Sequence, residues 1–206
     1  MRIRLSETQS RDYLSRLFQH MGSSAAQSEI VADHLTLAEM RGLASHGLSR
    51  IPFYTRQLRA RGYNPRPNFT VARETPSTAL LDADNAIGLV SGTFAMQLCI
   101  EKARETGCAG VSVTHANHIG YLAYYTMMAA KENMIGLALC NAGACTAVWG
   151  TDERVLGTDP VSIALPALNH PPVVFDAATS IVAQGKVAVA AIEGKPIPDN
   201  WAFGPD

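Results

Sequence analysis

The sequence predicts an α/β fold in which an N-terminal helical segment is followed by a mixed sheet with flanking helices. Apolar residues recur at helical spacing through the first part of the chain, whereas short β-prone runs alternate with helical runs in the rest. An Asn-Pro-Arg-Pro run at 64–67 separates the two patterns and interrupts regular structure. We therefore predict an N-terminal helical segment at 1–66 and an α/β domain at 67–206.

The N-terminal segment is expected to hold three helices. Ser6 and Gln9 have the spacing of a capping box, and the helix that they begin ends at Gly22. A second helix begins near Ala25 and carries apolar residues on one side. The third covers about 49–61 and is rich in arginine. Without interleaved aromatic residues, such a face is typical of a solvated helix and not of a nucleic-acid site.

The rest of the chain alternates strands and helices. Strands are predicted at 70–73, 78–81, 109–113, 135–140, 161–165 and 173–175, and helices at about 91–105 and 120–133. The strand–helix–strand order between 109 and 140 predicts some parallel pairing within the sheet. His118 and Asn141 follow two of these strands, and ligands gather at the carboxyl ends of strands in such sheets. Both side chains are therefore candidates for one site.

Composition and charge exclude several classes of protein. The 206 residues have a formal net charge of −1, which gives no electrostatic reason to expect binding to nucleic acid or to an anionic membrane. No apolar run is long enough to span a bilayer, and the N-terminus does not resemble a signal peptide. The four cysteines include no CxxC pair, so we expect reduced thiols and a cytoplasmic protein.

The first candidate site is a glycine-flanked Ser-His pair, Ser45 and His46. Arg50 and Tyr54 follow, four residues apart, which places them on one face of the expected helix. A 2-oxo acid needs a cation for its carboxylate and an acid beside its carbonyl oxygen, and this set supplies both. The spacing also fits a structural alternative, a helix–loop–helix corner with a capping serine and a core histidine. For Arg50 the alternative to a substrate carboxylate is a structural ion pair.

His118 is the second candidate for proton chemistry. If Asn117 caps the helix that follows, the imidazole lies near the positive end of the helix dipole, which favours its neutral form. Such a histidine can exchange a proton with a substrate oxygen. The alternatives are a packed structural histidine, or a metal ligand together with His115, although no nearby carboxylate completes a ligand set. We predict no metal site, and we interpret His34 as a packed residue of the second helix.

The sequence contains neither of the two common phosphate-binding loops. No GxGxxG and no GxxxxGK[ST] motif occurs in the chain. From the residues alone, we infer no more than an α/β enzyme with a histidine-rich cleft.

A series of short motifs runs along nearly the whole chain. They are Arg41-Gly42 through Ser45-His46-Gly47 with Arg50 and Tyr54, Asn117-His118-Ile119-Gly120 with Tyr124-Tyr125, Leu156-Gly157-Thr158-Asp159-Pro160, Phe175-Asp176-Ala177-Ala178-Thr179-Ser180, Gly185-Lys186, Ile197-Pro198 and Trp201-Ala202. With these motifs in this order, the sequence resembles the type-2 malate/L-lactate dehydrogenase family. Members of that family reduce 2-oxo acids, or related imino and keto compounds, with NAD(P)H.

The resemblance implies a non-Rossmann cofactor-binding fold, a homodimer, NAD or NADP as cofactor, and a small 2-hydroxy or 2-oxo acid as substrate. Carried over by motif, His46 and His118 flank the reacting carbonyl, and Ser45 and Tyr54 orient the donors. The motifs leave open which histidine donates the proton. The expected cofactor contacts are Asn141, Ala142, Asp176, Ala177, Ala178, Thr179, Ser180 and Lys186.

Members of this family continue for another large segment, so we expect the α/β domain to be incomplete at its C-terminus. Part of the cofactor site in the family comes from that segment. We therefore expect this chain alone to bind NAD(P)H weakly or not at all, and to expose an apolar patch where that segment would pack. Two alternatives to an active dehydrogenase stay open: a non-catalytic truncated scaffold or assembly partner, and a metal hydrolase built around His115 and His118.

Overall fold

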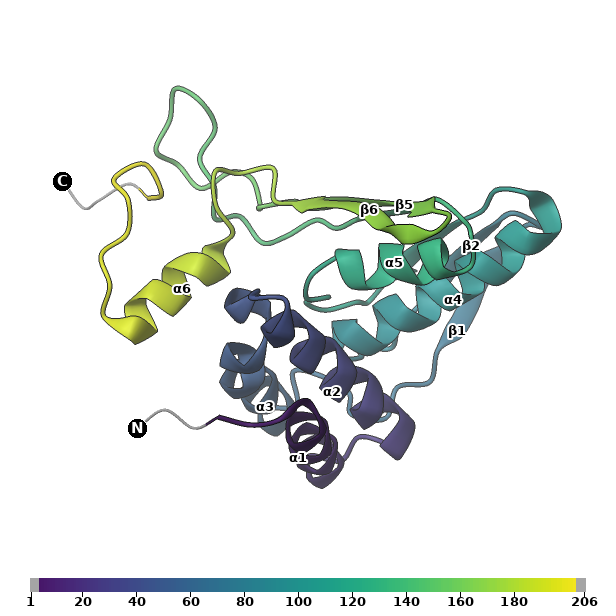
Figure 1. Ribbon diagram of the computed structural model, residues 1–206, viewed down its shortest axis with the longest axis horizontal. Helices are drawn as coiled ribbons and strands as arrows, with labels where there is room; N and C mark the ends of the chain where they lie inside the picture. Colours follow the sequence, from purple (N-terminus) through teal and green to yellow (C-terminus); the bar gives the residue numbers. More distant parts are fainter. Residues whose placement is uncertain (1–3, 203–206) are drawn as a thin grey trace.

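The computed structural model describes residues 4–202, in which a group of helices packs beside an α/β part (Figure 1). The first helices are α1 (Glu7–His20), α2 (Ala25–Met40) and α3 (Ile51–Arg59), and the 3₁₀ turns η1 (Ala44–His46) and η2 (Leu48–Arg50) precede α3. The predicted starts of α1 and α2 are confirmed, because Ser6 and Ser24 each form a capping box. The third helix is shorter than predicted. Arg50 lies at its N-cap, and not within the helix that carries Tyr54.

One apolar core joins these helices to the start of α4 (Gly88–Thr106). Phe18 of α1, Leu35 of α2 and Tyr54 of α3 are fully buried in it, together with Leu89 of α4. The core therefore continues past residue 66. The division of the chain at that residue stays a prediction.

A first sheet has the order β1-β2-β3. β1 (Thr70–Glu74) pairs antiparallel with β2 (Thr78–Asp82), and β2 pairs parallel with β3 (Gly110–Thr114). α4 is the crossover between the two parallel strands. It ends at Gly107, whose φ of +79° is the left-handed cap that a glycine supplies without strain.

A second, antiparallel sheet has the order β4-β5-β6 and consists of β4 (Gly136–Leu139), β5 (Val161–Ala167) and β6 (His170–Ala177). The sequence predicted one mixed sheet, whereas the structure has two sheets, of which only β1-β2-β3 is mixed. Parallel pairing across 109–140 is wrong, since β3 and β4 belong to different sheets. The reason is a long-range contact: Ala164 of β5 packs against Ala123 and Ala130 of α5 (Ala123–Lys131), and this brings β5 beside β4.

α6 (Gln184–Glu193) was not expected from the sequence. Ala183 precedes it without a side-chain cap, so no start signal marks it. The helix packs against η1, far earlier in the chain, and thereby reaches the histidine motif. No helix within 4–202 combines the length and the apolar character that crossing a membrane requires.

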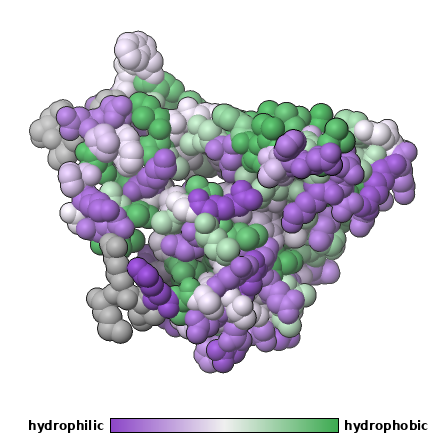
Figure 2. Space-filling view, viewed as in Figure 1, coloured by the Kyte–Doolittle hydropathy of each residue, from purple (hydrophilic) through white to green (hydrophobic). Residues whose placement is uncertain are grey.

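The sheet β4-β5-β6 has one covered face and one open face. Ser162 and Ala164 are fully buried on the side of α5. The opposite face, here called the outer face, carries six large apolar side chains that are 37% to 66% exposed: Leu137, Leu139, Ile163, Leu165, Val173 and Phe175. Figure 2 shows the resulting apolar surface along the upper right of the molecule. Apolar side chains are thus exposed together on the outer face.

Candidate active site

Two imidazoles from distant parts of the chain meet in the structure. His46 lies in η1, and His118 lies in the loop between β3 and α5. Their ring centroids are 5.9 Å apart, and the rings are 14° from parallel. Both line one cleft of about 2270 Å³, which Arg50 and Asn141 also line. The motif residues therefore face a common space.

A hydroxyl group lies at Nδ1 of each imidazole. Ser45 Oγ is 2.9 Å from His46 Nδ1, and Tyr54 Oη is 2.8 Å from His118 Nδ1. Burial raises the pKa of Tyr54 above its ordinary value, so the phenol keeps its proton and can donate it to Nδ1. This arrangement favours the tautomer of His118 in which Nε2 carries the proton. Each ring is thereby oriented by a neighbouring hydroxyl.

Both imidazoles are neutral at pH 7. Burial, and then the nearby Arg50 guanidinium, lowers the pKa of His46 to about 4. Burial, Arg50 and His46 lower the pKa of His118 to about 3. The sequence predicted a neutral His118 for another reason, a helix capped by Asn117. That reason is wrong, because α5 begins only at Ala123 and has no side-chain cap from the residues just before it.

Stability is expected to fall as the pH is lowered from 7 to 5. An unfolded histidine has a pKa of about 6.5, whereas the folded pKa values of His46 and His118 are about 4 and about 3. Between these values the unfolded chain binds more protons, so stability present above pH 6.5 is lost on acidification, by roughly 2 kcal/mol per histidine at pH 5. Urea unfolding checks this: His118→Asn should reduce the loss between pH 7 and pH 5 by roughly 2 kcal/mol. An unchanged loss would contradict the assignment.

Close main-chain contacts fix the start of the loop that carries His118. Asn117 Nδ2 donates to the main-chain oxygens of Asn85 and Ala86, at 3.1 and 2.8 Å. Gly88, the first residue of α4, lies so near that a Cβ there would collide with the carbonyl oxygens of Asn117 and His118. The position of the imidazole thus depends on a residue without a side chain.

Gly120 and His34 fix the other end of this loop. Gly120 has a φ of +71°, and a Cβ there would collide with the His34 ring. His34 Nε2 accepts a hydrogen bond from Tyr121 N at 3.3 Å. The His34 ring lies 4.6 and 4.5 Å, between centroids, from the rings of Tyr121 and Tyr124. The interpretation of His34 as a packed helix residue is confirmed, since it is fully buried.

Arg50 reaches the same cleft without an acidic partner. Its Nε donates to Ser45 O at 2.6 Å. Among residues 4–202 no ion pair includes Arg50, so the structural alternative finds no support there. Gly185, in the first turn of α6, is so close that a Cβ there would collide with the end of the guanidinium and would lie only 3.0 Å from Ser45. The guanidinium therefore lies between η1 and α6.

The residues expected to contact the cofactor fall into two groups. Asn141 and Ala142 line the cleft, whereas 176–180 and Lys186 do not. Asp176 Oδ2 instead accepts a hydrogen bond from Ala123 N at 2.8 Å, at the N-terminus of α5. Asp176 thus supplies the cap that the residues next to α5 lack. Burial raises the pKa of this carboxyl group.

The rest of that segment is bonded to its own chain. Thr179 N donates to Thr158 O at 2.9 Å, and Ser180 Oγ donates to Val182 O at 2.9 Å. Ala177 ends β6, and Ala178 follows it with no polar side-chain atom to offer. Any contact of these residues with a nucleotide must come from main-chain groups or from a rearranged side chain.

The two residues of the possible metal site point in different directions. His115 Nδ1 lies 3.0 Å from Asp82 Oδ2 on the exposed surface, whereas His118 lines the cleft. Within 4–202 no three His, Cys, Asp or Glu side chains are placed to hold a metal ion. The geometry gives no support to the metal-hydrolase alternative.

Two aromatic residues at the site were not predicted. The Phe53 ring centroid is 5.7 Å from that of His118, and Phe53 lines the cleft. Tyr63, whose pKa is raised by burial, forms a hydrogen bond with the main chain of His118. Nothing in the local sequence distinguishes either residue from an ordinary core aromatic, so only the tertiary contacts reveal them.

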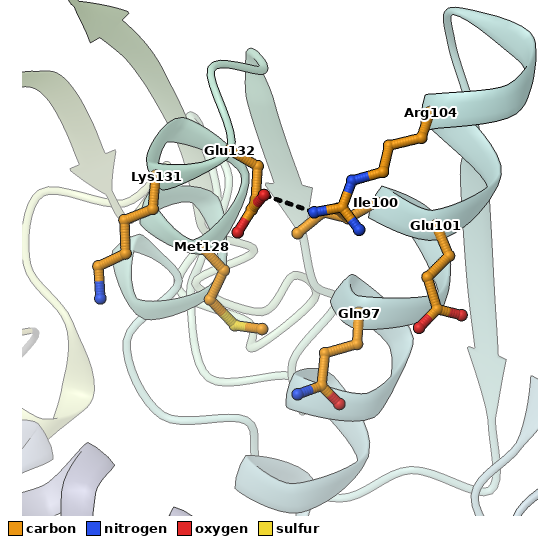
Figure 3. Close-up of a pocket in the computed structure, with 7 residues that line it drawn as sticks. All are labelled: Gln97, Ile100, Glu101, Arg104, Met128, Lys131 and Glu132. Carbon is orange, nitrogen blue, oxygen red and sulfur yellow. Dashed lines mark hydrogen bonds and ion pairs between the residues drawn. The ribbon is translucent and has the colours of Figure 1, made fainter.

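A smaller groove of about 290 Å³ lies between α4 and α5 (Figure 3). Its lining includes side chains of both charges: Glu101, Arg104, Lys131 and Glu132. Arg104 is already paired with Glu132. The groove has no histidine, cysteine or tyrosine in its lining. The histidine cleft is the candidate active site.

Fold and site together define a mixed α/β protein with a cleft lined by two histidines. The chain belongs to the malate/L-lactate dehydrogenase family, whose model matches residues 5–206. The resemblance seen in the motifs is therefore confirmed.

Comparison with individual known proteins agrees with this family. The chain is 40% identical to the malate dehydrogenase of Pyrococcus abyssi, over 98% of this chain and 55% of that protein. It is 32% identical to the ureidoglycolate dehydrogenase (NAD(+)) of Escherichia coli (strain K12), over 94% of this chain and 56% of that protein. The solved malate dehydrogenase from Pyrococcus horikoshii OT3 matches with a TM-score of 0.88 at 38% identity, over 90% of this chain and 53% of that one. The chain spans about half the length of the curated relatives that it matches.

Proposed function

We propose that this chain carries the catalytic site of an NAD(P)-dependent dehydrogenase that interconverts a 2-hydroxy acid and a 2-oxo acid. The observation behind the proposal is the pair of neutral imidazoles beside Arg50, a guanidinium with no acidic partner in the described residues. Family membership supports it, because the relatives above are named malate and ureidoglycolate dehydrogenases.

In the proposed reaction Arg50 binds the substrate carboxylate through its outer nitrogens. His46 or His118, once its imidazole has taken up a proton, donates that proton to the carbonyl oxygen during reduction and returns to the neutral form; during oxidation the neutral ring takes the proton back. Ser45 and Tyr54 keep the two rings in place. NAD(P)H, when bound, supplies the hydride that reaches substrate C2.

Substrate binding itself favours proton uptake in this arrangement. Arg50 contributes to the low pKa of both His46 and His118. A carboxylate on Arg50 offsets that positive charge, which raises both pKa values in the complex. Only once the acid is bound do the imidazoles become better able to hold the proton that reduction consumes.

The cleft fits a nicotinamide nucleotide in part. Asn141 and Ala142 would line the nicotinamide side. The first turn of α6, which has no side-chain cap, opens on the cleft at Gln184 and Gly185, and the N–H groups of these two residues suit a phosphate. Contacts from 176–180 and Lys186 stay part of the proposal. The relative named for NAD(+) supports NAD over NADP, and the two small sheets support a non-Rossmann site.

Two further properties belong to the same proposal. The family resemblance supports a homodimer, which sedimentation analysis would show. All four cysteines carry free thiols, which supports a reducing, cytoplasmic location. The alternative function is a non-catalytic scaffold or assembly partner.

The test is a panel of 2-oxo acids assayed by the absorbance of NADH and NADPH. The chain is measured alone and joined to the portion of the P. horikoshii malate dehydrogenase that it does not match, because we expect weak nucleotide binding by the chain alone. Turnover of at least one 2-oxo acid is the expected result. Absence of both turnover and NADH binding in the joined protein would favour the scaffold. Loss of activity with a chelator would favour the metal hydrolase.

A further inference from the structure

His118 lies in a stretch of chain whose shape must be fixed by side chains. Residues 116–121 form neither helix nor strand, so no ladder of main-chain hydrogen bonds holds them. From residue 117 onward the stretch is nevertheless half-buried or buried. Main-chain polar groups in such a place need partners from elsewhere in the chain. Each partner of this stretch therefore limits where the imidazole can lie.

Tyr125, in the first turn of α5, supplies one of these partners. Its Oη donates to Ile119 O at 2.5 Å, at the short end of the range for a bond between two oxygens. Within 4–202 no other group donates to this carbonyl oxygen. Burial raises the pKa of Tyr125 above its ordinary value, so the phenol keeps the proton that it donates. The bond ties the residue that follows His118 to α5.

The ring of Tyr125 has little freedom to move. The residue is only 2% exposed, although it contributes to the wall of the cleft. Gly92 of α4 lies so close that a Cβ there would come within 2.7 Å of Tyr125 Cζ. The ring of His34 in α2 lies 5.7 Å away, between centroids. Contacts with two other helices thus make the hydroxyl group a fixed anchor.

The peptide group that Tyr125 holds is one that could otherwise rotate. Gly120 follows Ile119 and has a φ of +71°. Because a glycine adopts φ of either sign, the peptide that joins these two residues can change its orientation at little conformational cost. The hydrogen bond from Tyr125 selects the orientation in which Ile119 O faces α5. Without this bond the backbone next to His118 is free to relax.

Two other tyrosines also hold His118. Tyr54 Oη lies 2.8 Å from its Nδ1, and Tyr63 forms a hydrogen bond with its main chain. Tyr125 adds the carbonyl group of the next residue. The three phenols come from different segments of the chain, so together they restrict both the ring and the backbone.

We propose that Tyr125 is a positioning residue for His118: its hydroxyl group fixes the Ile119 carbonyl and thereby the direction in which the imidazole faces the cleft. Tyr125 acts through the main chain and not on the reacting atoms. Its contribution to turnover rests on the proposed function, whereas its effect on the imidazole does not. The neighbouring Tyr124 has a different task, because its Oη donates to Asp33 Oδ2 at 2.7 Å.

Tyr125→Phe, compared with Tyr124→Phe, provides the test. Each change removes one hydroxyl group that donates a hydrogen bond, and each should lower the melting temperature by about 2–4 °C. The imidazole nitrogens of His118 are observed by ¹⁵N NMR in the whole chain at pH 7, where the bond from Tyr54 favours a proton on Nε2.

We expect the spectrum of His118 to show a smaller share of this tautomer in Tyr125→Phe, because the bond from Tyr54 weakens as the loop relaxes. Tyr124→Phe should keep the parent spectrum, since Asp33 lies outside the cleft wall. An unchanged His118 spectrum in Tyr125→Phe, or an equal change in both variants, would overturn the proposal.

Kinetics of the joined protein separate positioning from substrate binding. Tyr125→Phe should lower kcat about tenfold and leave KM for the acid within about twofold, because Arg50 is not touched. Tyr124→Phe should leave both constants within about twofold. An unchanged kcat in Tyr125→Phe would contradict the role in turnover. If the joined protein turns over no 2-oxo acid, the proposed function fails, and the His118 spectrum still decides whether Tyr125 positions the ring.

Gly92→Ala moves the same hydroxyl group without removing it. The added methyl group would lie 2.7 Å from Tyr125 Cζ, so the end of the ring must shift relative to Ile119. We expect the His118 spectrum to change in the same direction as in Tyr125→Phe, and this variant decides if Tyr125→Phe does not fold. Gly110→Ala, at a glycine with open space around it, is the control and should keep the parent spectrum. A parent-like spectrum in Gly92→Ala would overturn the proposal.

Discussion

His118→Ala is expected to lower kcat for the reduction of the best 2-oxo acid by at least ~10²-fold, and His46→Ala should do the same. Each change removes an imidazole that lines the cleft and whose Nδ1 is held by a hydroxyl. Truncation leaves the surrounding backbone contacts of Asn117 in place, so the fold should persist. Steady-state assays with NADH or NADPH, together with circular dichroism, check both points.

His115→Ala is the matched control for both histidines. This imidazole is exposed and paired with Asp82, outside the cleft wall. Its loss should leave kcat within about twofold of the parent, as expected for a surface substitution. Near-normal kcat in His46→Ala or in His118→Ala would remove that residue from the proposed mechanism, and the comparison would then identify the proton donor.

Arg50→Lys should raise KM for the acid about tenfold or more, because an ammonium group cannot reproduce the two parallel hydrogen bonds of a guanidinium. Of the two interpretations of Arg50, the structure favours binding of the substrate carboxylate over a structural ion pair. Its Nε is bound to Ser45 O, and within 4–202 no carboxylate neutralises it. Arg50→Lys should therefore change KM more than it changes kcat.

Arg56→Lys, on the exposed side of α3, controls for the loss of a guanidinium in general. It should leave KM unchanged. If Arg50→Lys also left KM unchanged but lowered the melting temperature, Arg50 would be a structural residue that ties η1 to α3.

Local signals in the sequence were sufficient for much of the fold. The capping boxes at Ser6 and Ser24 and the glycine cap at Gly107 act within a few residues, and the helices begin or end where these signals stand. The same holds for Ser45 beside His46, since the hydrogen bond joins adjacent residues.

Contacts between residues far apart in the chain determined the parts of the fold and site that the sequence did not predict. α5 is capped by Asp176 from β6, more than fifty residues away, and no pattern near Ala123 could predict it. The partner of β4 depends on how β5 packs over α5 and not on the order of elements. The pKa of His118 was expected to follow a helix dipole, but it follows burial and Arg50, which lies in another part of the chain.

Three glycines at the site have a consequence for mutational tolerance. Gly88, Gly120 and Gly185 each stand where a Cβ would strike the loop of His118, the ring of His34 or the guanidinium of Arg50. None of them carries a functional group, so a search for chemically reactive side chains passes over all of them. In a saturation mutagenesis scan they should nevertheless be as intolerant as the histidines, even to alanine. Gly110 and Gly143, which have open space around them, should accept alanine. The sequence space open to this site is therefore limited by backbone clearance as much as by its acid–base groups.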